Sequence, residues 1–159
     1  MSRLSINNTI LTVSLVFMLN SVSAQNTDLM VDIGVNAFHE GDFSKANLLF
    51  ENALKVDSNK LKLQFYHGVN LIKIHKYEKA TFFLKKVVKK DPSGKIFPEA
   101  SYFLGEMLKQ QQQYKLSIME FKKAKGHYLQ NKKDFYFKKS SREINSTIYA
   151  MRHSKDIDK

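Results

Sequence analysis

Residues 34–57 read GVNAFHEGDFSKANLLFENALKVD, and residues 68–91 read GVNLIKIHKYEKATFFLKKVVKKD, a second copy displaced by 34 positions. Residues of the same kind stand in register at six positions of the two copies. The matched pairs are Gly34 with Gly68, Phe43 with Tyr77, Ala46 with Ala80, Phe50 with Leu84, Ala53 with Val87, and Asp57 with Asp91. Self-similarity at a fixed period is typical of stacked supersecondary units. The sequence therefore predicts a repeat protein.

A third copy follows with its spacing stretched to 37 residues. Gly105, Tyr114, Phe121 and Ala124 are its counterparts of Gly68, Tyr77, Leu84 and Val87, and Ser117 stands where the other copies have alanine. The three additional residues fit into the turn-rich stretch 93–98, where an insertion costs little free energy.

Each copy contains two amphipathic helices, because apolar residues recur three and four positions apart. The predicted pairs are 28–40 with 44–56, 61–74 with 77–90, and 98–111 with 114–129. A glycine in the middle of a helix costs about 1 kcal/mol relative to alanine. We therefore expect helices to cross closely at Gly34, Gly68 and Gly105. The expected small partners are Ala46, Ala80 and Ser117, and Phe50, Leu84 and Phe121 should bury against the next repeat.

The composition favours one all-α domain. The chain has 159 residues, 43% of them hydrophobic, with only 2 prolines and 6 glycines, which leaves few breaks for a many-stranded β fold. It has no cysteine, so a disulfide framework and a thiolate metal site are excluded.

Residues 1–24 resemble a secretory signal peptide. Arg3 precedes a hydrophobic run over residues 10–19, and small residues then lead to Ala24. An uncleaved anchor is the alternative, but the run is much shorter than the roughly 20 residues that span a bilayer. Cleavage removes only Arg3 from the charge count, which changes the formal net charge from +11 to +10. The prediction is an exported protein, periplasmic or associated with the outer membrane, with no transmembrane span after cleavage.

The repeated residues resemble those of the tetratricopeptide repeat (TPR): a small residue in the first helix, an aromatic that opens the second, and small and large apolar residues along it. The resemblance covers residues 27–60, 61–97 and 98–130, within a repeat region of 25–130. It implies an α-solenoid of three hairpins. Residues 131–152 are expected to form a capping helix over the last hydrophobic face, and 153–159 a flexible tail. The pattern has a glycine just before the second helix, and Gly41 is that residue in the first repeat. His75 and Gln112 replace this glycine in the second and third repeats.

The same resemblance implies a non-catalytic scaffold that binds a protein or peptide on a concave groove lined by the first helices. Carboxylate-gripping members have asparagine where this chain has Val35, Val69 and Glu106, so that mode is not implied here. Ordinary packing is the alternative for Phe65, Tyr66 and Tyr102. The implied groove residues are Val31, Val35, Phe38, His39, Lys62, Phe65, Tyr66, Val69, Lys73, Glu99, Tyr102, Glu106 and Lys109.

A more distant resemblance links the exported repeat array to the N-terminal TPR region of bacteroidete OmpA-like envelope proteins. Those proteins are associated with type IX secretion and gliding. It places the expected partner in a secretion or envelope assembly.

The lysines of the second helices form a basic flank. We interpret Ala80, Leu84 and Val87 as part of a buried stripe whose solvent side the lysines cover. The alternative function is binding of anionic envelope polymer or lipid headgroups. Nucleic acid is disfavoured, because no recognised nucleic-acid motif is present. The flank comprises Lys85, Lys86, Lys89, Lys90, Lys122 and Lys123.

No catalytic motif accompanies the repeats. The five histidines lack metal-binding spacing such as HExxH, and neither a phosphate-binding glycine loop nor GxSxG occurs. Glu40 and Asp42 are interpreted as a solvated turn. The prediction is a protein that is not an enzyme and has no metal or cofactor.

Overall fold

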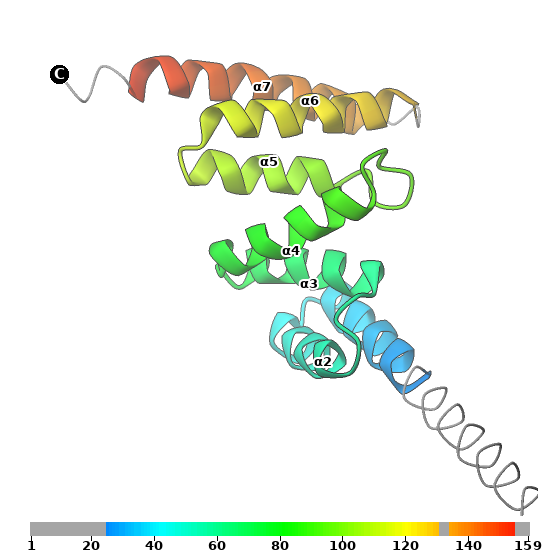
Figure 1. Ribbon diagram of the computed structural model, residues 1–159. Coiled ribbons are helices and arrows are strands. Elements are labelled where there is room, and N and C mark those ends of the chain that lie inside the picture. The colour runs from blue at the N-terminus through cyan, green and yellow to red at the C-terminus, as the bar shows by residue number, and fades with distance from the viewer. Residues whose placement is uncertain (1–24, 131–133, 155–159) are drawn as a thin grey trace, which may run out of the picture. The chain divides into compact units, whose positions relative to one another are not determined.

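The computed structural model describes residues 25–130 and 134–154, and these residues form helices joined by turns and loops, without a strand (Figure 1). The predicted all-α fold class is confirmed, and each helix starts and ends within three residues of its predicted limits up to Gln130. No helix in these ranges is long and apolar enough to span a bilayer. The signal-peptide prediction concerns residues 1–24, which lie outside the described part. The helices are residues 25–39, α2 (Phe43–Val56), α3 (Leu61–Lys73), α4 (Tyr77–Lys90), α5 (Ala100–Gln110), α6 (Tyr114–Gln130) and α7 (Asp134–Ser154).

The chain divides into two compact units, one ending at Leu63 and the other beginning at Gln64. The first unit holds the hairpin of residues 25–39 and α2. Asp42 caps α2 because its carboxylate accepts a hydrogen bond from the Lys45 backbone N–H at 3.0 Å. The ring of Phe50 is fully buried and lies so close to Gly34 that a Cβ there would come within 2.6 Å of it.

The second unit repeats this crossing twice. A Cβ on Gly68 would lie 3.2 Å from Leu84, and one on Gly105 would lie 2.8 Å from the ring of Phe121. Ser117 also reaches the crossing, since its hydroxyl donates a hydrogen bond to the Gly105 carbonyl at 2.8 Å. The three glycines therefore occupy equivalent positions, as the sequence predicted.

The side chain that covers each glycine differs from the expectation. Small residues at 46, 80 and 117 were expected to lie against the glycines. The atoms nearest to a Cβ there belong to Phe50, Leu84 and Phe121 of the same hairpins. The spacing from the glycine to its covering residue is 16 in all three hairpins. A ring or a branched chain fills the space that a Cβ would need, so the glycine permits a large side chain at the crossing.

The turns inside the three hairpins share one geometry, with a residue in the left-handed region at Gly41 (φ 84°), His75 (φ 60°) and Gln112 (φ 58°). This is a Schellman-type helix end, in which the backbone N–H that follows reaches back to the last turn of the helix. The reaching bonds are Asp42 N–H to the Ala37 carbonyl at 2.9 Å, Lys76 N–H to Leu71 at 2.8 Å, and Gln113 N–H to Leu108 at 2.9 Å.

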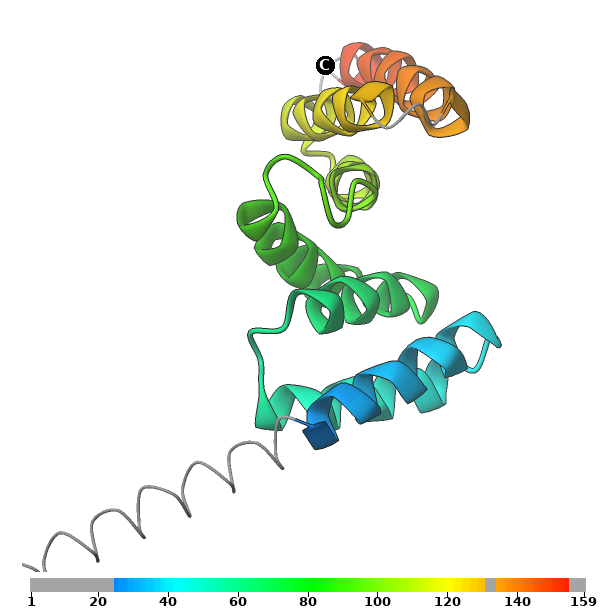
Figure 2. The same cartoon turned by 90° about the vertical axis from the view of Figure 1, so that its right-hand side faces the viewer.

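Helix α7 forms the end of the second unit and packs on α6, which packs in turn on α5 (Figures 1 and 2). Tyr128 of α6 stacks on Tyr136 of α7 with ring centroids 4.8 Å apart. Their cluster also contains the buried Tyr102 and Phe121. Helix α7 ends at Ser154, two residues beyond the predicted end of the capping helix at Arg152. The rest of the predicted tail, residues 155–159, lies outside the described ranges.

Candidate functional site

In the first unit, the implied groove residues are partly engaged with the protein itself. Val35 is buried, with 8% of its surface exposed, and Phe38 is half-buried with its ring 5.7 Å from that of Phe43. Lys62 forms an ion pair with Asp32 at 2.7 Å. His39 is exposed. This unit therefore offers few uncommitted groups to a partner.

In the second unit, Phe65 and Val69 are buried, and Lys73 is exposed. Phe65 stacks on Phe97 of the loop before α5, with centroids 4.3 Å apart and planes inclined by 18°. Tyr66 is half-buried and meets Phe65 edge-on at 5.3 Å. Packing explains the position of Phe65, whereas Tyr66 remains partly exposed.

Tyr102 lies in the core, because only 1% of its surface is exposed. The ammonium group of Lys139, on α7, lies 4.6 Å from the centroid of its ring. Its hydroxyl donates a hydrogen bond to Glu106 Oε1 at 2.8 Å. The prediction that Tyr102 lines the groove is therefore wrong. Helix α7 covers the ring, and ordinary packing explains its position.

Glu106 and Lys109 line a pocket of about 560 Å³ in the second unit. The walls combine apolar side chains with two carboxylates, one amide and one ammonium group. Helices α3, α5, α6 and α7 all contribute to it. The residues of this Glu106 pocket are Ile72, Glu106, Met107, Lys109, Gln110, Tyr114, Glu143 and Ala150.

The charges in the Glu106 pocket are unequally matched. Lys109 donates to Glu143 Oε2 at 3.0 Å and to the Ser146 hydroxyl at 2.7 Å, so Glu143 has a counter-ion. Glu106 accepts the Tyr102 hydrogen bond and forms no ion pair within the described part of the chain. Burial raises the pKa of Glu106, although the Tyr102 hydrogen bond and the charge of Lys139 act in the opposite direction.

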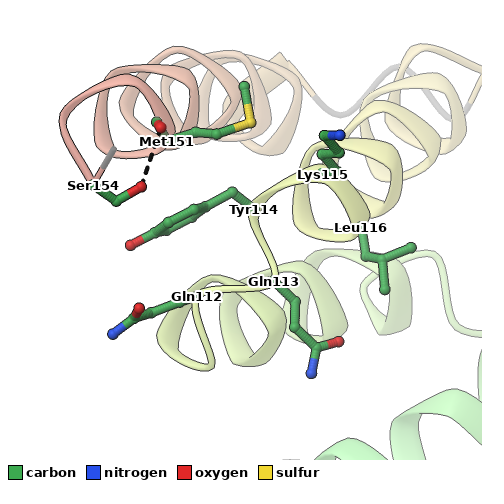
Figure 3. A pocket seen from close by; sticks show the side chains of 7 residues that line it. All are labelled: Gln112, Gln113, Tyr114, Lys115, Leu116, Met151 and Ser154. Carbon is green, nitrogen blue, oxygen red and sulfur yellow. Dashed lines mark hydrogen bonds between the residues drawn. The ribbon is translucent and has the colours of Figure 1, made fainter. Parts of the chain in front are cut away.

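A second pocket, of about 410 Å³, lies where the α5–α6 turn meets the C-terminal end of α7. Figure 3 shows the ring of Tyr114 between Gln112 of the turn and Ser154, whose hydroxyl is bonded to the Met151 carbonyl at 3.1 Å. Leu116 adds an exposed apolar side chain. Tyr114 lines both this turn pocket and the Glu106 pocket.

The basic flank is arranged as interpreted. Leu84 and Val87 of α4 are fully buried, while Lys85, Lys89 and Lys90 are exposed. Lys86 is half-buried because its ammonium group lies over the ring of Phe82, 4.3 Å from the centroid. On α6, Lys122 is exposed, and Lys123 pairs with Glu120 at 2.6 Å.

The sequence missed the residues that α7 contributes. The contacts of Glu143 and Lys139 were not predicted, because α7 lies outside the repeat register and no spacing linked it to Glu106. Phe97 was read only as part of a loop. The aromatic content of residues 135–137 was the one signal that α7 covers an aromatic face. In residues 25–130 and 134–154, no group of three or more metal-binding side chains comes together.

No protein-family model and no curated protein is similar enough to this sequence to count as a match. Solved structures, however, share its fold. The type III secretion translocator chaperone SycD from Yersinia enterocolitica aligns over 89% of this chain and 93% of its own with a TM-score of 0.67 and 17% identity. The first TPR of Spaghetti (RPAP3), bound to an HSP90 peptide, covers 80% of this chain and 94% of its own, with a TM-score of 0.66 and 13% identity.

A further structure holds SycD in complex with a peptide of the translocator YopD, with a TM-score of 0.62, 17% identity, and coverage of 80% of this chain and 93% of its own. At these identities the likeness concerns the fold. The chain therefore has TPR-type helical hairpins, as the resemblance of its repeats implied.

Proposed function

We propose that the chain is a non-catalytic scaffold that binds a protein segment on its second unit. The observation that supports this proposal most is the repeated hairpin, whose crossings at Gly34, Gly68 and Gly105 are built alike. Two solved structures of similar fold contain a bound peptide. Tyr66 and Lys73, with the Glu106 pocket, are the groups that this unit keeps for a partner.

The proposed place of action is the cell envelope, because residues 1–24 have the pattern of an export signal. The more distant resemblance to bacteroidete envelope proteins suggests a secretion assembly as the setting. Fractionation of native cells tests this point separately, since recovery in the cytoplasmic fraction contradicts the location and leaves the scaffold proposal standing.

The scaffold is tested by cross-linking in native cells followed by capture of the full-length chain. Tyr66→Ala is compared with Tyr66→Phe, which keeps the ring and is the matched control. Binding through Tyr66 predicts that one cross-linked protein is recovered with the wild type and Tyr66→Phe and is depleted with Tyr66→Ala. Equal recovery with all three contradicts this contact.

The second candidate function is binding of anionic polymer or lipid headgroups. It is favoured by the exposed Lys85, Lys89 and Lys90 beside the exposed ring of Phe82. Charge reversal of these three lysines to glutamate should then abolish binding to anionic vesicles and leave the Tyr66-dependent partner bound. Binding through exposed charges also falls steeply as salt rises, because the screening length shortens to about 8–10 Å near physiological ionic strength. Loss of the protein partner on charge reversal alone would place the interface on the basic flank.

A further inference from the structure

The Glu106 pocket differs electrostatically from the rest of the chain. The sequence has a formal net charge of +11, yet the pocket has two carboxylates, Glu106 and Glu143, and one ammonium group, that of Lys109. The lysine is already committed to Glu143 and Ser146. Within the described part of the chain, Glu106 is therefore the pocket carboxylate that forms no ion pair.

The surroundings of Glu106 resist a negative charge. Burial raises its pKa, and the nearby Glu143 raises it further, while the Tyr102 hydrogen bond and the charges of Lys139 and Lys109 lower it by less. Tyr102 supplies one hydrogen bond, and Lys139 lies over the Tyr102 ring instead of pairing with Glu106. A cation brought into the pocket would compensate a carboxylate that the protein itself compensates incompletely.

The remaining walls suit an aliphatic chain. Ile72, Met107 and Ala150 are apolar, and Tyr114 offers a ring. The volume of about 560 Å³ is in the range of small-ligand pockets and is ample for one long side chain. Lysine and arginine combine an aliphatic stem with a charged end, so they fit apolar walls that lead to a carboxylate.

We infer that the Glu106 pocket receives a lysine or arginine side chain of the protein segment that the scaffold binds. This inference rests on the proposed function and adds the chemistry of the partner. The stem would lie along Ile72 and Met107, and the charged end would bond Glu106. The overall positive charge opposes approach little at long range, because salt screens it beyond about 8–10 Å. Recognition would then depend on contact in the pocket.

The test is an NMR titration of the ¹⁵N-labelled full-length chain with n-butylguanidinium, a mimic of the arginine side chain. n-Butylurea is its neutral isostere, and butyrate is the anionic counterpart. The expected result is saturable shifts of the Lys109, Tyr114 and Ala150 amides with the guanidinium, and affinity lower by about 10-fold for the urea, since a hydrogen bond to a charged group is worth more than a neutral one.

Glu106→Gln and Glu78→Gln complete the experiment. Glutamine at 106 can still accept the Tyr102 hydrogen bond, so the fold should persist while guanidinium affinity falls by about 10-fold. Glu78 is exposed on α4, and its replacement should change nothing. The inference is overturned if Glu106→Gln binds the guanidinium as tightly as the wild type does. It is also overturned if butyrate shifts the pocket amides in place of the guanidinium, or if the guanidinium causes no saturable shift there. Undiminished capture of the protein partner in Glu106→Gln would do so while leaving the proposed function intact.

Discussion

The loops that leave the first and second hairpins begin with the same residue and are organised differently. Asp57 follows α2, and its Oδ1 accepts a backbone hydrogen bond from Asn59 at 2.8 Å. Asp91 follows α4 and accepts three, from Lys95 at 3.0 Å and from Ile96 and Phe97 at 2.9 Å each. Both residues stand at the same place in the repeat. One position therefore closes a short turn in one repeat and organises a long loop in the next.

The difference explains how the stretched repeat keeps its hairpins alike. Asp91 is buried, with 7% of its surface exposed, so its carboxylate substitutes for water as the acceptor of three loop N–H groups. Phe97 is thereby held where it stacks on Phe65. The Asp91 side chain thus holds the longer loop in place, and the hairpins on either side retain the geometry of the first repeat.

Asp91→Asn should disturb the long loop most, because an amide has only one acceptor oxygen. We expect a loss of about 2 kcal/mol in the free energy of unfolding, since hydrogen bonds to charged groups are worth about 1.5–3 kcal/mol. Asp57→Asn keeps an acceptor for Asn59 and should cost less than about 1 kcal/mol. Urea unfolding measures both. Amide hydrogen exchange at residues 95–97 should accelerate in Asp91→Asn, and an equal loss in both variants would contradict the different roles.

The same carboxylate predicts a pH dependence. Burial by itself would raise the pKa of Asp91, but the three N–H donors and the charge of His127 outweigh it, so the pKa is lowered from 3.8. A lowered pKa in the folded state means that the unfolded state binds protons more readily in acid. The stabilisation is complete above pH 3.8 and falls as the pH drops through the lowered value. The difference between wild type and Asp91→Asn should therefore shrink in acid, and a difference that grows would contradict the assignment.

Gly94 belongs to the inserted stretch and has no counterpart in the first loop. Its φ of 61° is in the left-handed region, and a Cβ there would overlap the imidazole of His127. Gly94→Ala should destabilise the second unit by about 1–2 kcal/mol from backbone strain, with displacement of the ring in addition. Gly126→Ala is the matched control, because nothing lies within 4 Å of a Cβ at that helical position. It should stabilise by about 1 kcal/mol, and melting temperatures distinguish the two.

The hairpins could be predicted from sequence because their signal is repeated: the same small and aromatic residues recur in register, and the structure brings each glycine to a crossing. The loops could not be predicted in the same way. Asp57 and Asp91 are the same residue type at the same repeat position, and they differ in whether later backbone N–H groups turn back toward the carboxylate. That Asp91 accepts three hydrogen bonds follows only from the folded path of residues 95–97.

The candidate site shows the same division. Glu106 and Lys109 follow from the repeat register, which places them on the first helix of the third hairpin. Their electrostatic roles depend on Glu143 and Lys139, which come from a helix outside that register. The register also misplaced Tyr102, because it contains no information about which faces α7 covers. The repeat register thus predicts where a residue lies in its helix. Which charged groups pair with it depends on tertiary contacts that the register does not describe.

The smallest expected effect concerns the turns inside the hairpins, where Gly41 and Gln112 have the same left-handed conformation. Gln112→Gly should relieve strain in the folded state, but glycine gains freedom in the unfolded chain, so we expect a net gain of about 0.5 kcal/mol. Gly41→Ala is the reverse experiment. No atom lies within 4 Å of a Cβ there, and its expected loss of about 1 kcal/mol is therefore conformational. Opposite signs in urea unfolding would show that the two turns are equivalent in energy as well as shape. A loss on Gln112→Gly would mean that contacts of the glutamine side chain in the turn pocket outweigh its backbone strain.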